Sequence, residues 1–116
     1  MVLRQIFDTV IAQTKELHWY DNTYKILNER AVICFDDADE LIIKRPDRVM
    51  YNDNLVIVVD YKFGKREEKY HKQVKQYMFL IHGMEYFKNK DIKGYLYYIN
   101  PEEPDKSTIE ECFLRE

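Results

Sequence analysis

An acidic residue and a lysine two positions apart end the most apolar stretch of the sequence. Asp60 and Lys62 follow residues 55–59 (LVIVV), a run that predicts a buried strand. Side chains alternate between the two faces of a strand, so Asp60 and Lys62 share a face and Tyr61 points to the other. A carboxylate beside an ammonium at the end of a buried strand is costly unless water solvates the pair or it serves a function.

The acidic-x-Lys pattern occurs three times in this chain, so the pattern alone identifies no site. The copy at residues 67–69 falls at the start of an expected helix, where residues two apart lie on different faces. The copy at 91–93 lies in an expected loop, with no evident carboxylate partner on a paired strand. Only the copy at 60–62 ends an apolar strand, which makes it the candidate.

Asp47 is the carboxylate that a hairpin would bring near Asp60. Residues 51–54 (YNDN) are turn-forming and join the strand of Asp47 to the strand of Asp60. If the turn is centred between its second and third residues, Asp47 lies opposite Val58 and diagonal to Asp60. Two carboxylates at that separation can share Mg²⁺, which prefers oxygen ligands. The alternative is a pair of solvated charges at the ends of two strands.

Two side chains on the following helix are further candidates. Gln73 and Tyr77 are four residues apart, so they share one face of a helix expected over residues 67–87. This helix follows the Asp-x-Lys strand directly and is expected to pack over it. The alternative is an ordinary amphipathic helix with Tyr77 in the core.

Glu29 is an acidic residue within a strand that otherwise looks buried. Taken by itself, it is better explained by an ion pair with Arg30, Arg45 or Arg48 than by a place in a catalytic site. It becomes a site candidate only through the family resemblance below.

The elements expected to position these side chains are helices and strands in a mixed order. Apolar spacing and turn-forming residues predict helices over 3–19 and 67–87, and strands over 25–35, 41–50, 55–62, 94–99 and 112–114. Pro46 interrupts the second strand and indicates an edge or a bulge, whereas the third strand, apolar on both faces, is expected at the centre. The order of helix, three-strand meander, helix and strand predicts one α/β domain with a mixed central sheet flanked by helices.

Composition limits the classes of protein that fit. The 116 residues suit one domain, 46% of them are apolar, and the formal charge of −3 gives no overall positive field for nucleic acid. Cys34 and Cys112 indicate reduced thiols in a cytoplasmic protein and are too few for a four-cysteine zinc or iron–sulfur site. The apolar runs are too short to span a membrane, and there is no glycine-rich nucleotide loop.

Together these motifs resemble the RecB-type branch of the PD-(D/E)xK nucleases, the nuclease domains attached to AddAB- and RecBCD-type helicase–nucleases. The resemblance rests on DRV at 47–49, VVDYKFG at 58–64 and Gln73-x-x-x-Tyr77, and it covers about residues 25–100. It implies a restriction-endonuclease-like core and a Mg²⁺- or Mn²⁺-dependent deoxyribonuclease, with an exonuclease favoured over an endonuclease. DNA end processing or recombinational repair would be its setting.

The resemblance also implies roles for individual residues. Asp47 and Asp60 would bind the metal, and the backbone carbonyl of Tyr61 would add a ligand. Lys62 would orient the attacking water or stabilise charge on phosphorus. Glu29 would complete the ligand shell or hold a water. Gln73 and Tyr77 would help to position the site and the DNA. The basic residues expected to meet the DNA backbone, unless they form only a solvated helix face, are Lys65, Arg66, Lys69, Lys72 and Lys75.

The chain departs from the family in three ways. Many relatives carry a histidine on an upstream helix, but the surroundings of His18 do not match well enough to give it that role. The four cysteines that hold an iron–sulfur cluster in some relatives are missing, and so is the helicase. We therefore expect either a small stand-alone nuclease or a fragment of a larger helicase–nuclease. The compact length and the early helix favour the fragment, partnered by a helicase or ATPase module. The rival interpretations are a non-catalytic nucleic-acid-binding module that keeps the fold and a protein-interaction domain with a tyrosine-rich docking face.

Overall fold

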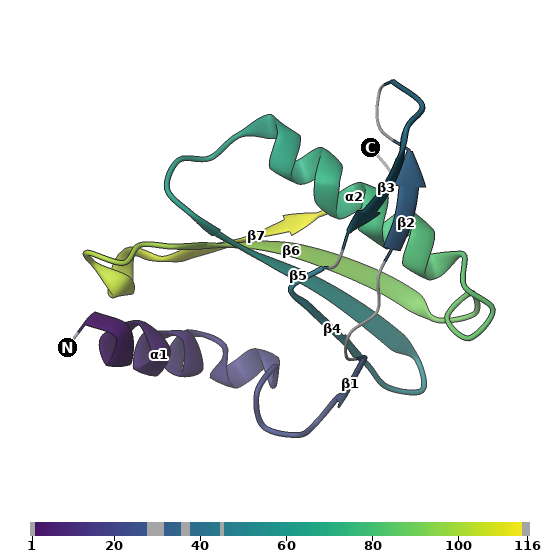
Figure 1. Cartoon of the computed structure of the whole chain (residues 1–116). Coiled ribbons are helices and arrows are strands. Elements are labelled where there is room, and N and C mark those ends of the chain that lie inside the picture. The colour runs from purple at the N-terminus through teal and green to yellow at the C-terminus, as the bar shows by residue number, and fades with distance from the viewer. Residues whose placement is uncertain (1, 28–31, 36–37, 45, 115–116) are drawn as a thin grey trace.

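A five-stranded mixed sheet with one helix on each face forms the body of the molecule (Figure 1). The computed structural model describes residues 2–27, 32–35, 38–44 and 46–114. The elements are α1 (Val2–Gln13), η1 (Lys15–Leu17), β1 (Lys25–Ile26), β2 (Val32–Phe35), β3 (Leu41–Lys44), β4 (Arg48–Tyr51), β5 (Leu55–Phe63), α2 (Glu68–His82), β6 (Asp91–Ile99), η2 (Pro104–Lys106) and β7 (Thr108–Cys112). Within the described residues, neither helix combines the length and the apolarity needed to cross a membrane.

β5 is the central strand, as its apolar sequence predicts. The strand order is β1-β4-β5-β6-β7, in which β5 and β6 run parallel and all other neighbours are antiparallel. The parallel pair is joined by α2, because parallel neighbours need a crossover connection. The strand is covered on both faces: Val56 and Val58 pack under α2, whereas Ile57 and Val59 pack toward α1. This α/β architecture with a mixed sheet between helices agrees with the sequence-based expectation.

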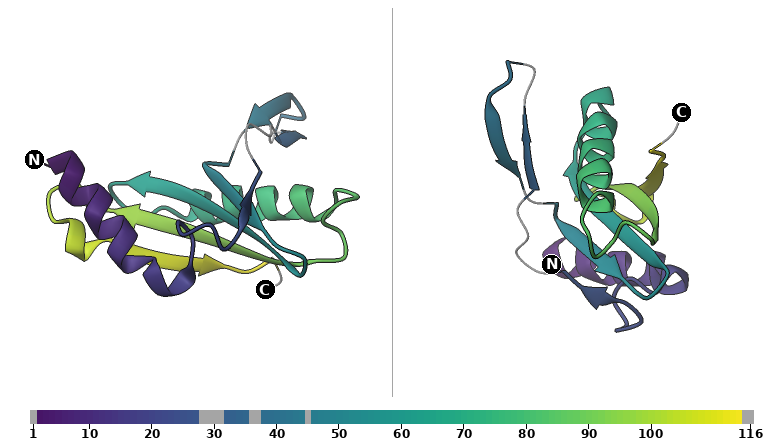
Figure 2. Two further views of the ribbon diagram at one scale, coloured as in Figure 1. Left: turned by 90° about the horizontal axis from the view of Figure 1, so that it is seen from below. Right: turned by 90° about the vertical axis from the view of Figure 1, so that its right-hand side faces the viewer.

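The predicted three-strand meander is wrong in its first two strands. The stretches expected as continuous strands over 25–35 and 41–50 each divide between two sheets, because β2 and β3 pair only with each other as a separate hairpin. Figure 2 shows this hairpin standing beside α2, away from the main sheet. The break between β3 and β4 falls around Pro46, which has no amide hydrogen to donate to a neighbouring strand.

Several element boundaries also differ from those predicted. The first helix ends at Gln13 rather than at residue 19, since the chain turns through η1 and reaches a left-handed conformation at His18, with φ of 61°. α2 ends at His82, before a glycine, rather than at residue 87. β6 begins at Asp91 rather than at residue 94, so the 91–93 copy of the acidic-x-Lys pattern lies in a strand and not in a loop.

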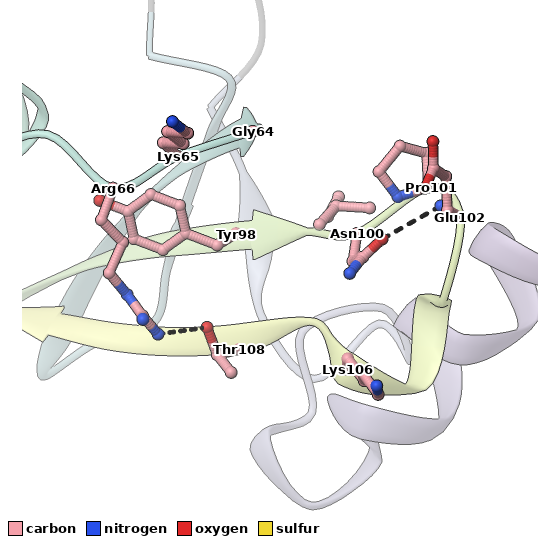
Figure 3. A pocket seen from close by; sticks show the side chains of 10 residues that line it. Gly64, Lys65, Arg66, Tyr98, Asn100, Pro101, Glu102, Lys106 and Thr108 are labelled. Carbon is pink, nitrogen blue, oxygen red and sulfur yellow. Dashed lines mark hydrogen bonds between the residues drawn. The ribbon is translucent and has the colours of Figure 1, made fainter.

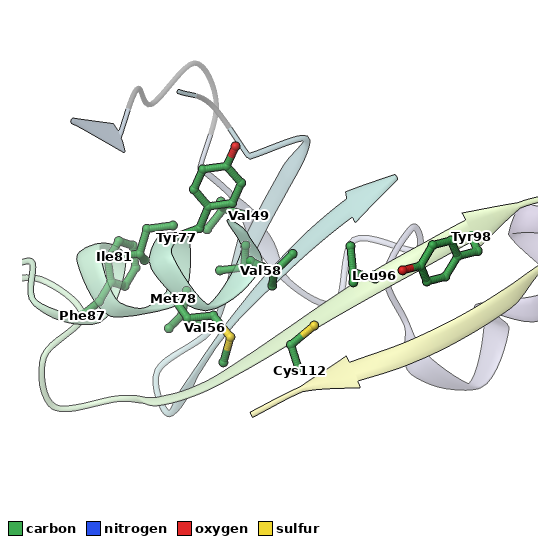
Figure 4. Close-up of a cluster of buried hydrophobic side chains, with 11 residues drawn as sticks. Val49, Val56, Val58, Tyr77, Met78, Ile81, Phe87, Leu96, Tyr98 and Cys112 are labelled. Atoms are coloured by element: carbon green, nitrogen blue, oxygen red, sulfur yellow. The ribbon is translucent and has the colours of Figure 1, made fainter. Parts of the chain in front are cut away.

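Gly94 allows α2 to lie close to the sheet. Residues from α2, β5 and β6 form one apolar cluster, in which Val56, Val58, Met78 and Leu96 are buried (Figure 4). A Cβ atom at position 94 would lie 2.3 Å from Met78 Sδ and 2.9 Å from Val74 Cγ1.

We expect Gly94→Ala to lower the free energy of unfolding by about 1–3 kcal/mol, because the added methyl overpacks the contact between α2 and β6. Urea unfolding measures the change. Gly83→Ala is the matched control, since a Cβ there meets only backbone oxygens at 3.5 and 3.6 Å, an ordinary contact. Equal stability of the two variants would contradict this account of the close approach.

Candidate functional site

Asp60 and Lys62 meet on the α2 side of β5, near the end of the strand. The residue Asp60 is 4% exposed, and the Nζ atom of Lys62 lies 3.0 Å from its Oδ2 atom. This ion pair confirms that the two side chains share a face. Lys62 keeps 20% of its side-chain surface, so its ammonium remains in reach of solvent.

Two residues in the first turns of α2, Tyr70 and Gln73, contact the ammonium of Lys62. Gln73 accepts a hydrogen bond from Nζ through its Oε1 atom at 2.9 Å. The Nζ atom also lies 4.6 Å from the centre of the Tyr70 ring, within range of a cation–π contact. Gln73 is therefore at the site, as the motif suggested. Tyr70 was not predicted, although it lies one helical turn before Gln73 and so shares its face.

Asp47 lies closer in register to Asp60 than the sequence suggested. The last paired residues of β4 and β5 are Arg48 and Val59, so the next position outward sets Asp47 opposite Asp60 rather than opposite Val58. The backbone amide of Asp47 donates to Asp60 Oδ1 at 3.3 Å, and the amide of Tyr61 donates to Asp47 Oδ2 at 2.8 Å. The carboxylates of Asp47 and Asp60 and the backbone amide of Tyr61 thus form one cluster.

The register differs because the hairpin turn is centred one residue later than predicted. The amide of Asn52 donates to the carbonyl of Leu55 at 2.9 Å, which makes Asp53 and Asn54 the two loop residues. The side-chain Oδ1 atom of Asn52 accepts from the amides of Asn54 and Leu55, both at 2.9 Å. This local side-chain contact fixes the turn.

The charge of Asp47 is disfavoured at this position. Burial of the carboxyl, together with the neighbouring carboxyl of Asp60, raises the pKa of Asp47 to about 6, against the lowering effect of the Tyr61 amide and Lys62. The residue as a whole is exposed, but its carboxyl is turned inward toward Asp60 and the Tyr61 amide. The site therefore carries two carboxylates that repel each other when both are ionised.

Asp47→Asn is expected to stabilise the metal-free protein at neutral pH. The raised pKa means that the folded chain binds a proton more readily than the unfolded chain, so stability falls as pH rises from about 4 to about 6 and stays low above it. One pKa unit corresponds to about 1.4 kcal/mol, and solvent screening of this exposed residue reduces the expected gain at pH 7.5 to about 1 kcal/mol.

Urea unfolding in EDTA at pH 4 and pH 7.5 measures this effect. The gain from Asp47→Asn is expected at pH 7.5 and not at pH 4, where the carboxyl is already protonated in the folded chain. Asp91→Asn, at an exposed position, is the control and should show no such gain. A gain of the same size at both pH values would contradict the placement of Asp47 beside Asp60.

On the opposite face of β5, Trp19 and Tyr20 contact Tyr61 and Arg48, the chain neighbours of Asp60 and Asp47. The hydroxyl of Tyr61 is hydrogen-bonded to the hydroxyl of Tyr20. The guanidinium of Arg48 lies 4.4 Å from the centre of the Tyr20 ring and donates to the carbonyl of Trp19 at 2.8 Å. No sequence pattern predicts this contact, because the loop after η1 reaches β5 only in the folded chain.

No protein-family model, no curated protein and no solved structure matches this chain.

The other predicted site residues have different positions. Tyr77 is 3% exposed and belongs to the apolar cluster under α2, a placement that favours a packing role (Figure 4). Glu29 lies outside the residues that the structure describes. His18 pairs with Asp21, at 2.6 Å between Nδ1 and Oδ2, on the exposed loop after η1. The backbone carbonyl of Tyr61 stays a predicted ligand.

The chemistry of the donor set fits a hard divalent cation. Asp47, just before β4, and Asp60, on β5, offer carboxylate oxygens, and Lys62 supplies one positive charge against two negative ones. Oxygen donors of this kind suit Mg²⁺ or Mn²⁺ and do not suit softer metals. Among residues 2–27, 32–35, 38–44 and 46–114, no three His, Cys, Asp or Glu side chains gather as a metal-binding group. A metal held here would therefore rely on these two carboxylates, backbone oxygen and water.

Proposed function

We propose that this chain is the catalytic domain of a metal-dependent nuclease that hydrolyses phosphodiester bonds in DNA. The observation that carries the proposal is the meeting of Asp47, just before β4, with Asp60 on β5. Lys62 lies beside Asp60, and Gln73 accepts a hydrogen bond from Lys62. Paired carboxylates beside a lysine suit phosphate chemistry, in which negative charge builds on phosphorus and must be neutralised.

Each residue has a definite part in this proposal. Asp47 and Asp60 would hold Mg²⁺ or Mn²⁺. The ion would lower the pKa of a water bound to it and would neutralise charge on the phosphate. Lys62 would point its ammonium at the reacting phosphate or the attacking water. Gln73 orients that ammonium by accepting its hydrogen bond at 2.9 Å. Tyr70 supports it through the face of its ring.

The finer parts of the proposal have more indirect support. The antiparallel pair β4 and β5, with Asp47 just before β4 and Asp60 on β5, is followed by a crossover helix to a parallel strand. This order supports a restriction-endonuclease-like core. The RecB-type motifs support a role in DNA end processing and recombinational repair, a helicase or ATPase partner, and a cytoplasmic location.

The direct experiment is digestion of linear single- and double-stranded DNA by the purified chain with Mg²⁺ or Mn²⁺, and with EDTA as the blank. Cleavage that depends on the ion is expected. Circular DNA added as a parallel substrate separates an endonuclease, which cuts it, from an exonuclease, which does not. DNA binding without cleavage in either ion would instead support the non-catalytic binding module.

Metal binding is expected to raise the melting temperature without any substrate. An ion at roughly 100 times its Kd adds about 2.7 kcal/mol to the stability of the folded state, which is roughly a 10 °C rise for a domain of this size. Asp47→Asn should abolish the rise, although the same substitution stabilises the metal-free protein. Differential scanning fluorimetry with Mn²⁺ measures both effects. An equal rise in the parent and in Asp47→Asn would place the ion elsewhere.

A further inference from the structure

A pocket of about 650 Å³ opens at the carboxyl ends of the parallel strands β5 and β6 (Figure 3). Its polar lining comes from three segments that are distant in sequence. The side chains that matter here are Lys65, Arg66, Tyr98, Asn100, Lys106 and Thr108. In α/β sheets, the crevice beyond the carboxyl ends of parallel strands is where ligands commonly bind.

The pocket adjoins the candidate catalytic site. Tyr98, in its wall, is the register partner of Lys62. Gly64, also in the wall, lies two residues beyond Lys62, which is roughly 7 Å along a strand. Gly64 has a φ of +104°, so the chain turns there and carries the next two residues over the pocket. A strand of nucleic acid whose phosphate lies at Lys62 would therefore continue into this pocket.

The lining favours an anion. Three cations, Lys65, Arg66 and Lys106, face one acidic side chain, Glu102. Among the described residues, none forms an ion pair with Lys65. Arg66 lies 2.5 Å from Glu110 through its Nε atom and donates to the Thr108 hydroxyl at 2.9 Å, which fixes its guanidinium at the pocket wall (Figure 3).

The third cation of the pocket, Lys106, forms an ion pair with Glu103. The ammonium of Lys106 lies 3.0 Å from Glu103, its partner one turn earlier, and both side chains are exposed. An exposed ion pair of this kind is weak, so a phosphate can take its place. Lys65 is thus the cation most available to a ligand, with Arg66 preorganised beside it.

An exposed aromatic side chain comes directly before the pocket wall in the chain, on the face of β5 opposite Lys62. Phe63 is 61% exposed, although it ends the most apolar strand of the molecule. It precedes Gly64 in the chain and is the register partner of Ile99, and both neighbours line the pocket. Cations that meet phosphates beside an exposed ring that meets bases are the combination used to hold a nucleic-acid strand.

We propose that this pocket binds the nucleic-acid strand next to the bond that is cleaved, with Lys65 and Arg66 on a phosphate and Phe63 stacked on an unpaired base. The assignment rests on the proposed nuclease function and adds to it the path of the strand. It predicts that binding of the strand is separable from cleavage, because none of these three side chains touches the two carboxylates.

The test is binding of a fluorescently labelled ten-nucleotide oligo-dT to the full chain in EDTA, measured by anisotropy over a range of salt concentrations. Lys65→Ala should weaken binding and reduce the slope of log K against log salt by about 0.7, the value for one phosphate contact with a single strand. Phe63→Ala should weaken binding about fivefold or more, through lost stacking, with little change in slope.

Lys93→Ala is the matched control, since Lys93 is an exposed lysine near the start of β6, at the other end of the sheet. Its affinity and salt slope should equal those of the parent. Unchanged binding in both Lys65→Ala and Phe63→Ala would overturn the proposal. So would displacement of the oligonucleotide by inorganic phosphate at equal concentration, because that would reveal a simple anion site.

The two proposals fail in different ways. Binding is measured without metal, so it is tested independently of cleavage. If the chain binds the oligonucleotide through Lys65 and Phe63 but cleaves no DNA, the strand-binding pocket is supported and the proposed nuclease function is contradicted. If the chain cleaves DNA with ion dependence, and the Lys65→Ala and Phe63→Ala variants bind and cut DNA as well as the parent, the nuclease function is supported and the strand-binding pocket is contradicted.

Discussion

Asp60→Asn is expected to reduce ion-dependent DNA cleavage at least about a thousandfold, because a bound metal supplies several kcal/mol of charge stabilisation and each 1.4 kcal/mol is tenfold in rate. The substitution keeps the size of the side chain and the hydrogen bond that Asp47 donates through its amide. It removes one of the two charges that would hold the ion. Steady-state cleavage of labelled linear DNA in Mg²⁺ and in Mn²⁺ measures the loss.

The chain supplies its own control for this experiment. Asp91 begins the third acidic-x-Lys copy and pairs in register with Leu55, five residues before Asp60 and so about 17 Å from it along the strand. Asp91→Asn removes the same charge from the same pattern and should cleave like the parent. If Asp60→Asn retains parental activity, the carboxylate pair is not the catalytic centre; if both variants lose activity, the loss is not specific to the site.

The parts of this site that could be predicted from sequence depend on local geometry. Strand alternation requires only that residues 55–62 be extended, so the shared face of Asp60 and Lys62 followed directly. The prediction that a hairpin brings Asp47 near Asp60 was also correct. The predicted register, with Asp47 opposite Val58, was wrong, because the Asn52 side chain selects which two residues form the turn. A shift of the turn centre by one residue moves the facing residue by two, which here keeps Asp47 on the same face and brings it nearer to Asp60.

The parts that could not be predicted depend on contacts distant in sequence. Gln73 and Tyr77 do lie on the sheet-facing side of α2, yet only Gln73 reaches Lys62, since the position of the helix along the sheet decides which turn meets the site. The contact of Tyr20 with Tyr61 joins residues 41 positions apart. The separate β2–β3 hairpin was missed because its apolar residues also suit strands of the main sheet.

Lys62→Met is expected to lower the free energy of unfolding of the metal-free protein by about 3–5 kcal/mol, the cost of leaving a buried charge without its partner. The Asp60 side chain is only 6% exposed, and the ammonium of Lys62 lies 3.0 Å from it. Methionine keeps most of the packing against the Tyr70 ring, so the loss reports mainly the charge. Urea unfolding in EDTA at pH 7.5 measures it, with Lys93→Met as the exposed control.

The double variant Asp60→Asn/Lys62→Met separates a charge effect from a packing effect. Interacting neighbours are non-additive, so the double variant should be about 1–3 kcal/mol more stable than Lys62→Met alone. Mn²⁺ should stabilise Lys62→Met strongly, because the ion replaces the missing positive charge beside Asp60, and should leave the double variant unchanged. Additive losses would mean that Lys62 and Asp60 are independent. Restoration of the single variant by Mn²⁺ would instead tie the structural role of Lys62 to the same carboxylate that the metal requires.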